Sequence, residues 1–301
     1  MTHYAWIGLG NMGAPMAGNL VKSGHTVTGF DLSEKAVQTA VEHGVTAASS
    51  IEEAVREADV VITMLPKGEH VREVCTQDAG VFASARQGTL LMDSSTVDIE
   101  TSQWCHDEAP KHGLRFVDSP LSGGISGAAA GTLAFMIGGS QEDVAEAMKH
   151  VEPMAGNVFN AGGPTAGIAA KIANNMMLFI AQMACSEGSQ LAKHLGLDPK
   201  TFWEIASASS GRSWPQQTWY PVAGIIDSSA ANNDFEATFR ADLAHKDVSL
   251  ALAAGEKAGL HLEAAALARE QLSRLQDEGL GDKDCSLVVK YVTPGRTQEE
   301  I

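Results

Sequence analysis

A glycine-rich turn early in the chain constrains the fold more than any other feature. It follows the apolar run that starts at Tyr4, it precedes an amphipathic stretch, and it comprises Gly8, Leu9, Gly10, Asn11, Met12 and Gly13. In a strand–turn–helix unit with this GxGxxG spacing, the first glycine permits the tight turn, the second lets the backbone approach a pyrophosphate, and the third lets helix and strand pack closely. Free N–H groups at the start of the helix then hold the phosphates. The pattern predicts a dinucleotide-binding unit.

Asp31 strengthens this prediction and bears on the choice of cofactor. It ends the second predicted strand, 18 residues beyond Gly13, where a carboxylate can accept hydrogen bonds from both hydroxyls of an adenosine ribose. The alternative is a turn-forming glycine cluster beside a surface aspartate, which the strand–turn–helix context disfavours. A carboxylate repels a 2′-phosphate, the next three residues include no cation, and Lys35 is expected to point elsewhere. NAD is therefore favoured over NADP.

Residues 1–163 alternate short apolar runs with amphipathic stretches. The runs, most of them apolar throughout, predict strands at 4–8, 26–30, 59–64, 89–93, 115–118 and 133–137. Unbroken apolar strands separated by helices indicate a parallel sheet covered on both faces. Gly24 and Gly44 stand where helices are expected to end. This half is predicted to be a Rossmann-type, doubly wound α/β domain.

The strand pattern ends at the Gly-Gly-Pro sequence of 162–164, and residues 164–301 are predicted to form an all-helical domain. One long helix, expected from Thr165 to about His194, joins the two domains and spans about 45 Å at 1.5 Å per residue. Asp198 and Pro199 are typical of an N-cap and a first helical position. Further helices are expected at 240–258 and 262–278, followed by a frayed polar tail at 293–301.

Composition narrows the classes of partner. The 301-residue chain has a formal net charge of −16, so its field repels nucleic acid and anionic membranes. The four cysteines lie far apart, without histidines at metal-ligand spacing, which favours reduced thiols and no metal site. The first strand starts too early for a leader peptide, and no apolar run is expected to approach the roughly 20 residues of a membrane span. These features predict a cytoplasmic protein.

Seven motifs, in order along essentially the whole chain, resemble those of the β-hydroxyacid dehydrogenases, and most of all the 3-hydroxyisobutyrate dehydrogenases. They are GLGNMGAPMAGNL at 8–20, ITMLP at 62–66, DSSTVD at 93–98, DSPLSGGISGAAAGTLAFMIGG at 118–139, GIAAKIANN at 167–175, SSGRSW at 209–214 and LAHKDVSLA at 243–251. The resemblance implies an NAD-dependent oxidoreductase that acts on a small hydroxy acid. It also implies a homodimer or homotetramer, in keeping with the apolar surface expected on the long helix and on the Ala-rich helices at 240–278.

The resemblance assigns residues of the first domain to cofactor and substrate. The cofactor groove would be lined by Leu65, Pro66 and Thr96, which stand at the ends of predicted strands. The substrate carboxylate would be held, through a hydroxyl and main-chain N–H groups, by Ser122, Gly123 and Gly124. Without the resemblance, this second stretch is equally a flexible loop.

In the long helix, the resemblance makes Lys171 the catalytic residue and Asn175 a group that hydrogen-bonds and orients the substrate. The two stand four residues apart and so share a helix face. Composition alone favours a lysine that extends to solvent. Further along, the resemblance places Lys246 and Asp247 towards the nicotinamide end and the substrate, with Phe239 near the ring. A surface Lys–Asp pair is the alternative.

One run departs from the family pattern. Relatives usually follow the SSGRSW motif with a Tyr-Asn-Pro-Val-Pro-Gly run, whereas here Trp219 and Tyr220 occupy the Tyr and Asn places. Together with Trp214 they are expected to form part of the substrate pocket wall. An indole is bulkier than a phenol and lacks its hydroxyl, so the departure changes pocket volume and hydrogen bonding. The identity of the hydroxy acid therefore stays open.

The expected reaction is reversible: NAD⁺ accepts a hydride from the carbinol carbon of a 3-hydroxy acid, and Lys171 exchanges the hydroxyl proton. As a base Lys171 must be neutral, so its pKa must fall below about 10.4, through burial and through the positive charges of Lys246 and oxidised nicotinamide. No metal is required. The alternatives are a dehydrogenase of serine-like substrates, a reductase of a short semialdehyde such as tartronate semialdehyde, an imine reductase, and a non-catalytic cofactor-binding scaffold. Relatives of the last two kinds lack the lysine found here at 171.

Overall fold

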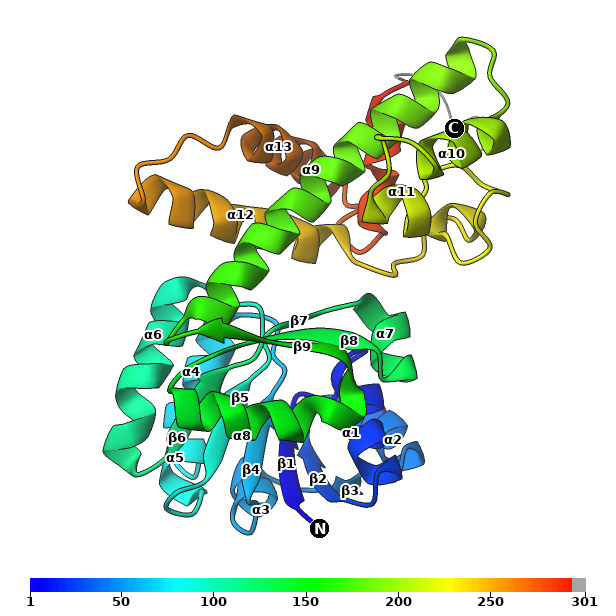
Figure 1. Ribbon diagram of the computed structural model, residues 1–301. Helices are drawn as coiled ribbons and strands as arrows, with labels where there is room; N and C mark the ends of the chain where they lie inside the picture. Colours follow the sequence, from blue (N-terminus) through cyan, green and yellow to red (C-terminus); the bar gives the residue numbers. More distant parts are fainter. Residues whose placement is uncertain (294–301) are drawn as a thin grey trace. The chain divides into compact units, whose positions relative to one another are not determined.

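The computed structural model describes residues 1–293, and the chain divides into two compact units (Figure 1). The first unit is Met1–Lys171 and contains every strand of the described residues. The second starts at Ile172, and its described secondary-structure elements are helices joined by turns. The predicted fold class is confirmed: a Rossmann-type sheet, a long helix and a helical C-terminal part. The predicted polar tail at 293–301 lies, apart from its first residue, outside the described residues.

The strands of the first unit form one nine-stranded sheet. They are β1 (His3–Ile7), β2 (Thr26–Phe30), β3 (Thr46–Ala47), β4 (Val60–Thr63), β5 (Leu90–Asp93), β6 (Arg115–Asp118), β7 (Leu121–Ser122), β8 (Leu133–Gly138) and β9 (Ala155–Gly162). Their order is β3-β2-β1-β4-β5-β6-β8-β7, with β9 paired to β8. All six predicted strands are present to within one residue at each end. The sequence did not predict β3 and β7, which have two residues each, or β9, which mixes polar and apolar residues and is largely exposed.

The sheet is parallel from β3 through β6 and then changes direction. Pairs β1–β2, β1–β4, β2–β3, β4–β5 and β5–β6 are parallel. Strand β8 is antiparallel to both β6 and β7, so the prediction of a wholly parallel sheet was wrong at this edge. The chain leaves β6, forms β7 three residues later and returns through the short helix α7 (Gly124–Ala130). Antiparallel neighbours need no long crossover, which is why a short connection suffices.

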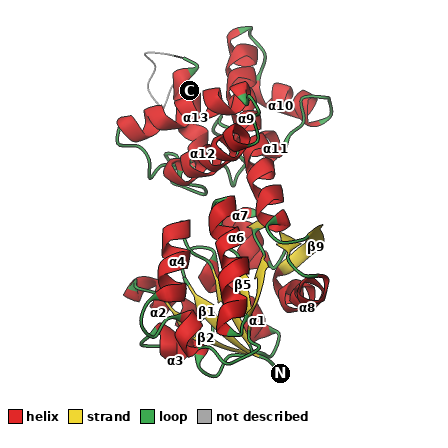
Figure 2. Ribbon diagram, turned by 90° about the vertical axis from the view of Figure 1, so that its left-hand side faces the viewer, coloured by secondary structure: helices red, strands yellow, loops and turns green. Residues whose placement is uncertain are grey.

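Helices lie on both sides of the sheet (Figure 2). They are α1 (Gly13–Lys22), α2 (Glu34–Glu42), α3 (Ile51–Val55), α4 (Gly68–Thr76), α5 (Val81–Ser84), α6 (Ile99–Glu108) and α8 (Gln141–Val151), with the 3₁₀ turns η1 (Ala109–His112) and η2 (Glu152–Met154). The side chains of Ser33, Asp98 and Ser140 cap three of these helices by accepting first-turn N–H bonds. Gly24 and Gly44 follow α1 and α2 in the left-handed conformation, with φ of +85° and +88°, which confirms them as helix stops.

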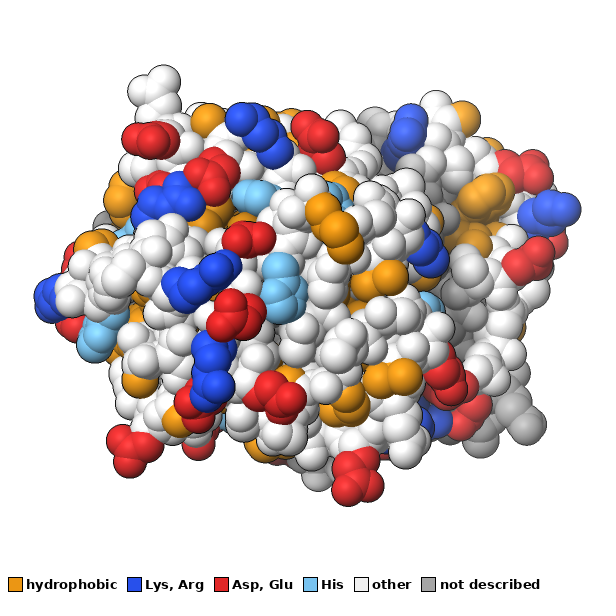
Figure 3. Space-filling model, turned by 90° about the horizontal axis from the view of Figure 1, so that it is seen from below, with side chains coloured by type: hydrophobic (Ala, Val, Ile, Leu, Met, Phe, Trp, Pro, Cys, Tyr) orange, Lys and Arg blue, Asp and Glu red, His pale blue; other side chains and the backbone are white. Residues whose placement is uncertain are grey.

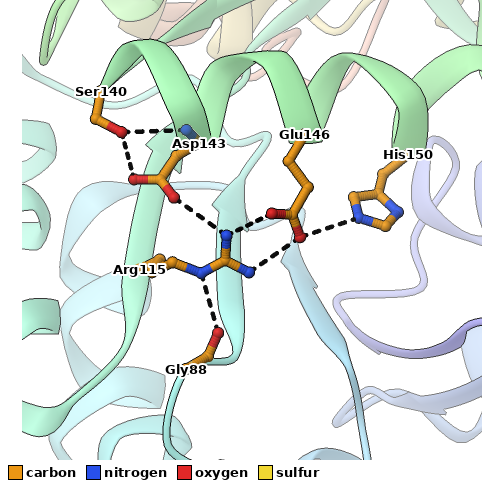
Figure 4. A network of polar contacts seen from close by, with 6 residues as sticks. All are labelled: Gly88, Arg115, Ser140, Asp143, Glu146 and His150. Carbon is orange, nitrogen blue, oxygen red and sulfur yellow. Dashed lines mark hydrogen bonds and ion pairs between the residues drawn. The ribbon is translucent and has the colours of Figure 1, made fainter.

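One ion-pair network ties the start of β6 to α8 (Figure 4). The guanidinium of Arg115 binds both carboxylate oxygens of Glu146, at 2.5 and 2.9 Å, and lies 3.3 Å from Asp143. His150 continues the network, 3.6 Å from Glu146, and its ring accepts or donates a 2.8 Å bond with the Tyr4 hydroxyl. The Arg115 guanidinium holds the pKa of Glu146 below its usual value, and burial lowers the pKa of His150. The network is a structural clamp on the flank of the sheet.

Acidic and basic side chains are interspersed on the face of the molecule from which the chain begins (Figure 3). Arg86 pairs with Asp59 at 3.0 Å, and Arg56 pairs with Glu52 one helical turn away. The view shows no continuous basic surface on this face, which agrees with a net charge of −16.

The second unit packs helices around its own apolar core. Helix α9 (Ala166–His194) starts in the first unit and continues into the second, followed by α10 (Pro199–Ser207), α11 (Trp214–Thr218), η3 (Ala230–Asn232), α12 (Ala241–Lys257), α13 (Glu263–Asp277) and η4 (Cys285–Tyr291). Asp198 caps α10 as predicted, by accepting the Thr201 N–H bond at 2.8 Å. The core brings Phe179 of α9 together with side chains of α12, α13 and η4, among them Val248, Leu272 and Val289.

Helix α9 is long and apolar enough to cross a membrane by length and composition alone. An 18-residue window within it has a mean hydropathy of 1.3, and 39% of that window is buried within the protein. The sequence prediction that no apolar run approaches a span was therefore too strict. Core helices of soluble proteins pass the same test, so a single such helix is weak evidence for a membrane.

Candidate active site

Two glycines of the turn between β1 and α1 are required by close packing. Gly8 has φ of +99°, and a Cβ built on it would lie 2.3 Å from the carbonyl oxygen of Met64. A Cβ on Gly13 would lie 2.0 Å from the Gly8 oxygen. Around Gly10, by contrast, no atom lies within 4 Å of such a Cβ. The backbone of Gly10 is therefore open to a close-approaching ligand, as a pyrophosphate site requires.

The first turn of α1 carries no side chain that would compete with an anion for its N–H groups, and of these groups the Ala14 N–H donates to the Gly10 oxygen at 3.1 Å. Its N-cap, Met12, makes no side-chain capping bond, and the first turn holds no acidic residue. Asp31 lies beside the turn: its Oδ2 accepts the Leu9 N–H bond at 2.7 Å, and its Oδ1 accepts the Ser33 N–H bond at 2.8 Å. A carboxylate oxygen can accept a second bond, so both remain able to receive a ribose hydroxyl. The structure thus brings the glycine turn and Asp31 together.

A buried aspartate that the sequence analysis did not single out organises the ends of β4 and β5. Asp93 is 2% exposed, and its Oδ1 accepts bonds from the Thr63 hydroxyl at 2.8 Å and the Ser95 N–H at 3.1 Å. The Ser95 hydroxyl in turn accepts the Leu65 N–H bond at 2.8 Å. Burial raises the pKa of the Asp93 carboxyl. The network links the two loops that carry the predicted groove residues Leu65 and Pro66 on one side and Thr96 on the other.

The predicted carboxylate-binding turn follows β7 and opens α7. Gly123 and Gly124 have φ of +133° and +65°, a backbone path that side chains rarely adopt. A Cβ on Gly123 would lie 3.0 Å from Leu133, whereas nothing lies within 4 Å of one on Gly124. Ser122 and both glycines are half-buried. The turn therefore has a defined, partly open backbone, which favours the binding role over a flexible loop.

A second buried aspartate, Asp118, anchors the start of α9. It is 2% exposed and ends β6. Its Oδ1 accepts the Thr165 N–H bond at 3.0 Å, and its Oδ2 accepts the Ile168 N–H bond at 2.8 Å. The Nε2 atom of His106, from α6, lies 2.7 Å from Oδ1. In the sequence, Asp118 ends an apolar strand and is the first residue of the motif at 118–139, but no pattern showed which backbone groups it would bind.

Lys171 and Asn175 stand one turn apart on α9, as predicted. Lys171 is 7% exposed and Asn175 1% exposed, so neither side chain extends freely into solvent. The snorkelling alternative for Lys171 is therefore disfavoured. In the second unit the Asn175 amide Nδ2 donates to Asp247 Oδ2 at 2.6 Å, and its Oδ1 accepts from Asn174 at 3.1 Å. These bonds fix the orientation of the Asn175 amide.

Lys246 and Asp247, on α12, form a cluster with Asn175 inside the second unit. The Lys246 Nζ atom lies 3.3 Å from Asp247 Oδ1, and Asp247 is 3% exposed. The alternative of a surface Lys–Asp pair does not describe this carboxylate. Asp247 receives a charge on one oxygen and the Asn175 amide on the other, so it couples the two predicted substrate residues.

The predicted aromatic residues divide between surface and core. Trp214 is 43% exposed, whereas Trp219 is 5% exposed and belongs to the core of the second unit. The two rings pack edge to face with centroids 4.7 Å apart, and Phe239 lies 5.7 Å from Trp219. Tyr220 is 1% exposed. Trp219 and Tyr220 are thus first of all packing residues, and Trp214 is the member of the set with accessible surface.

Comparisons with known proteins match both units. Residues 3–163 match the model of the NAD-binding domain of 6-phosphogluconate dehydrogenase, and residues 165–292 match that of the NAD-binding region of NADP-dependent 3-hydroxyisobutyrate dehydrogenase. The chain is 46% identical to a probable 3-hydroxyisobutyrate dehydrogenase of Mycobacterium tuberculosis, over 84% of this chain and 85% of that protein. It is 38% identical to an NAD-dependent L-serine dehydrogenase of Pseudomonas aeruginosa, over 99% and 100%.

A solved structure gives the same assignment. The Mycobacterium tuberculosis 3-hydroxyisobutyrate dehydrogenase described with L-serine superimposes with a TM-score of 0.89, at 42% identity, over 98% of this chain and 100% of that one. The open Gly10 backbone, the uncapped first turn of α1 and the Asp31 carboxylate fit a dinucleotide. The chain belongs to the β-hydroxyacid dehydrogenase family, close to the 3-hydroxyisobutyrate dehydrogenases, and is an NAD-dependent oxidoreductase that acts on the CH–OH group of a small hydroxy acid.

Proposed function

We propose that the chain oxidises a short 3-hydroxy acid of the 3-hydroxyisobutyrate type to the semialdehyde, with Lys171 as the proton-handling residue. The observation that carries the proposal is a buried lysine on α9, one turn before an asparagine whose amide is fixed by Asp247. A lysine held in a fixed, buried place can exchange a proton with a bound substrate, as a general acid–base group requires. Relatives named 3-hydroxyisobutyrate dehydrogenase support the substrate class.

NAD supplies the hydride acceptor when bound. The residues that would hold it are Gly8, Leu9, Gly10, Asn11, Met12, Gly13, Asp31, Leu65, Pro66, Thr96, Phe239, Lys246 and Asp247. The protein's own residues then bind, orient and deprotonate the hydroxy acid. Lys171 takes the hydroxyl proton on its Nζ atom in the oxidative direction and returns it in the reductive direction. Ser122, Gly123 and Gly124 bind the carboxylate, and Asn175 orients the hydroxyl. Residues 1–163 serve as the cofactor domain, and 164–301 as the substrate and assembly domain.

L-Serine is a second candidate substrate. It is also a 3-hydroxy acid, one of the relatives is named an L-serine dehydrogenase, and a similar solved structure is described with L-serine. An α-amino group in place of a methyl branch requires a hydrogen-bond acceptor near the substrate. Asp247 has acceptor capacity left for such a group, because Asn175 engages one of its oxygens and Lys246 the other, each once. The substrate panel below separates the two candidates.

The proposed active form is a homodimer or homotetramer working in the cytoplasm. Several large apolar side chains of the helical part are more than 60% exposed, namely Met177, Leu191, Leu195 and Leu267. A second copy of the chain would remove them from water. All four cysteines are free thiols, which agrees with a reducing compartment. Light scattering at micromolar concentration tests the assembly: a fully active monomer would contradict it.

A substrate panel tests the proposed function. The purified chain is mixed with NAD⁺ and, separately, with 3-hydroxyisobutyrate, L-serine, glycerate and the 2-hydroxy acid lactate, and the absorbance of reduced nicotinamide is followed. We expect the highest kcat/KM with 3-hydroxyisobutyrate and none with lactate, whose hydroxyl is one carbon nearer the carboxylate. A clear preference for L-serine would select the second candidate. Turnover of lactate alone would overturn the 3-hydroxy acid assignment.

A further inference from the structure

The N-terminus of α9 is held by a buried network that the roles assigned so far do not use. Asp118 accepts two backbone N–H bonds, one on each carboxylate oxygen: one from Thr165, directly before α9, and one from Ile168 in its first turn. A helix exposes four unsatisfied N–H groups at its start, and a carboxylate there also complements the positive end of the helix dipole. Ile168, which donates one of the bonds, lies one turn before Lys171. The contact is therefore made in the turn next to the lysine.

Two glycines bring the strand and the helix into direct contact around this carboxylate. A Cβ on Gly167 would lie 2.3 Å from the Met136 carbonyl oxygen and 2.8 Å from Asp118 Oδ2. A Cβ on Gly138 would lie 2.6 Å from the Gly167 nitrogen and 2.8 Å from Asp118 Oδ1. Both positions would clash with any side chain. The first turn of α9 is thus fixed against β6 and β8 by packing as well as by hydrogen bonds.

Two further features show that the contact between Asp118 and the start of α9 is held in one defined geometry. Thr165, directly before α9, has φ of +66°, a left-handed conformation that non-glycine residues seldom adopt unless their surroundings hold them there. His106 lies against Asp118 with its ring edge to face with Phe116, at a centroid distance of 4.6 Å. The His106 and Asp118 side chains are 8% and 3% exposed. The Nε2 atom of His106 lies 2.7 Å from Asp118 Oδ1, and the Thr165 N–H lies near both atoms, 3.0 Å from Oδ1 and 3.3 Å from Nε2.

We propose that Asp118, oriented by His106, is the positioning residue for Lys171: it fixes where α9 starts and which way its first two turns face, and so places the lysine Nζ atom. In this role Asp118 acts through the helix backbone, by its bonds to the Thr165 and Ile168 N–H groups. Placement of reacting groups is sensitive, because an error of about 1 Å can lower the rate about 100-fold. The inference rests on the proposed role of Lys171.

The test is a double-mutant cycle between Asp118 and Lys171. Asp118→Asn keeps the shape but replaces one acceptor oxygen with a donor, and Asp118→Ala removes both acceptors. We expect kcat to fall about 10-fold and about 100-fold respectively, with the Kd for NAD⁺ changed less than twofold. In a Lys171→Ala background, Asp118→Ala is expected to change the residual turnover less than twofold, because the group that it positions is already gone. Hydrogen–deuterium exchange of the amides at 165–171 should increase in both Asp118 variants.

Matched controls separate positioning from general stability. Ser140→Ala removes the cap of α8, a helix that carries no proposed site residue, and should lower the thermal midpoint while leaving kcat within twofold. His106→Gln can retain a donor near the Nε2 place and should keep kcat within about threefold, whereas His106→Leu should lose about tenfold. If Asp118→Ala does not fold, the kcat values of Asp118→Asn and of the two His106 variants still test whether Asp118 positions Lys171.

Two results would overturn the proposal. One is a folded Asp118→Asn protein with kcat within twofold of the wild type. The other is an Asp118→Ala loss that is equally large with and without Lys171, which would show that the aspartate acts independently of the lysine. A fully active Lys171→Ala protein would instead overturn the proposed function itself, so the two failures are distinguishable.

Discussion

Charged side chains make different contacts at the two ends of the parallel strands. At the carboxyl ends of the strands, Asp31, Asp93 and Asp118 each accept backbone N–H bonds, and the last two are 2% exposed. At the amino ends, Arg115 and Arg86 pair with carboxylates and remain about a third to a half exposed. Carboxylates that bind backbone fix the shape of loops and helix starts. Exposed ion pairs tie elements together without setting the geometry of a site.

From this difference we expect substitutions at the carboxyl ends of the strands to affect function and those at the amino ends to affect only stability. Strand β6 contains one example of each kind, with Arg115 at its first residue and Asp118 at its last. The Arg115 network clamps α8 (Figure 4), and the Asp118 network fixes the helix that carries Lys171. In an open α/β sheet, ligands bind outside the carboxyl ends of the strands, and the three aspartates lie at these ends.

Asp31 provides the largest expected change in cofactor specificity. The wild type should prefer NAD⁺ to NADP⁺, because the carboxylate repels a 2′-phosphate. Asp31→Asn removes the charge, and we expect the ratio of kcat/KM for the two cofactors to fall at least about 10-fold, equivalent to 1.4 kcal/mol. Asp31→Ala should lower NAD⁺ affinity further, since the Leu9 and Ser33 N–H groups lose their acceptor. Steady-state kinetics with both cofactors measure the ratio, and equal efficiencies in the wild type would refute the assigned role of Asp31.

At the amino ends of the strands, substitution of Arg115 should lower stability and leave turnover almost unchanged. Arg115→Met keeps much of the side-chain volume and removes the bonds to Glu146 and Asp143. Because the pair is partly exposed, we expect a loss of only about 1 kcal/mol in the free energy of unfolding. The turnover number should stay within twofold. Urea denaturation and kinetics on the same preparation check both values. A tenfold loss of turnover without unfolding would contradict the purely structural role of the amino-end ion pairs.

The pH dependence of stability is the smallest expected effect. The folded pKa of Glu146 is lowered by Arg115, so its contribution is present above the unfolded pKa and is lost as the pH falls through the folded one. The folded pKa of His150 is lowered by burial, so the unfolded chain takes up a proton first as the pH falls. Both shifts predict a thermal midpoint that declines between about pH 7 and about pH 4. Substituting His150 with Gln should remove the part of the decline near neutrality, and a midpoint that rises on acidification would contradict both assignments.

Much of the first unit could be predicted from the sequence because its signals are local. The GxGxxG spacing, the apolar strands and the helix-stopping glycines each act over a few residues, and the six predicted strands lie where they were expected. The antiparallel edge at β8 could not be predicted, because strand direction depends on how β7 and α7 return the chain. Strand β9 was missed for a different reason, since an exposed edge strand lacks the apolar pattern of a buried one.

The candidate site was predictable only in part. A resemblance in sequence pointed to Lys171 and Asn175, but not to the Asp247 bond that orients the Asn175 amide. Both aspartates bind groups that are far away in sequence: Asp93 accepts from the side-chain hydroxyl of Thr63, 30 residues away, and Asp118 accepts from the backbone N–H of Ile168, 50 residues away. Such pairs leave no periodic pattern. The burial of Trp219 was likewise set by its packing against Phe239 and not by its position in a motif.

The turnover of a Lys171→Ala variant tests whether this lysine handles the proton of the hydroxy acid. NAD⁺ binding should be unchanged, because the glycine turn and Asp31 are intact, and kcat for the hydroxy acid should fall by about 10² to 10⁴. An exposed lysine of the same unit is the control, and Lys149→Ala should retain full turnover. Loss of activity with normal NAD⁺ affinity is the predicted result. A Lys171→Ala protein that keeps more than about a tenth of wild-type turnover, above the range for a lost acid–base group, would contradict the account.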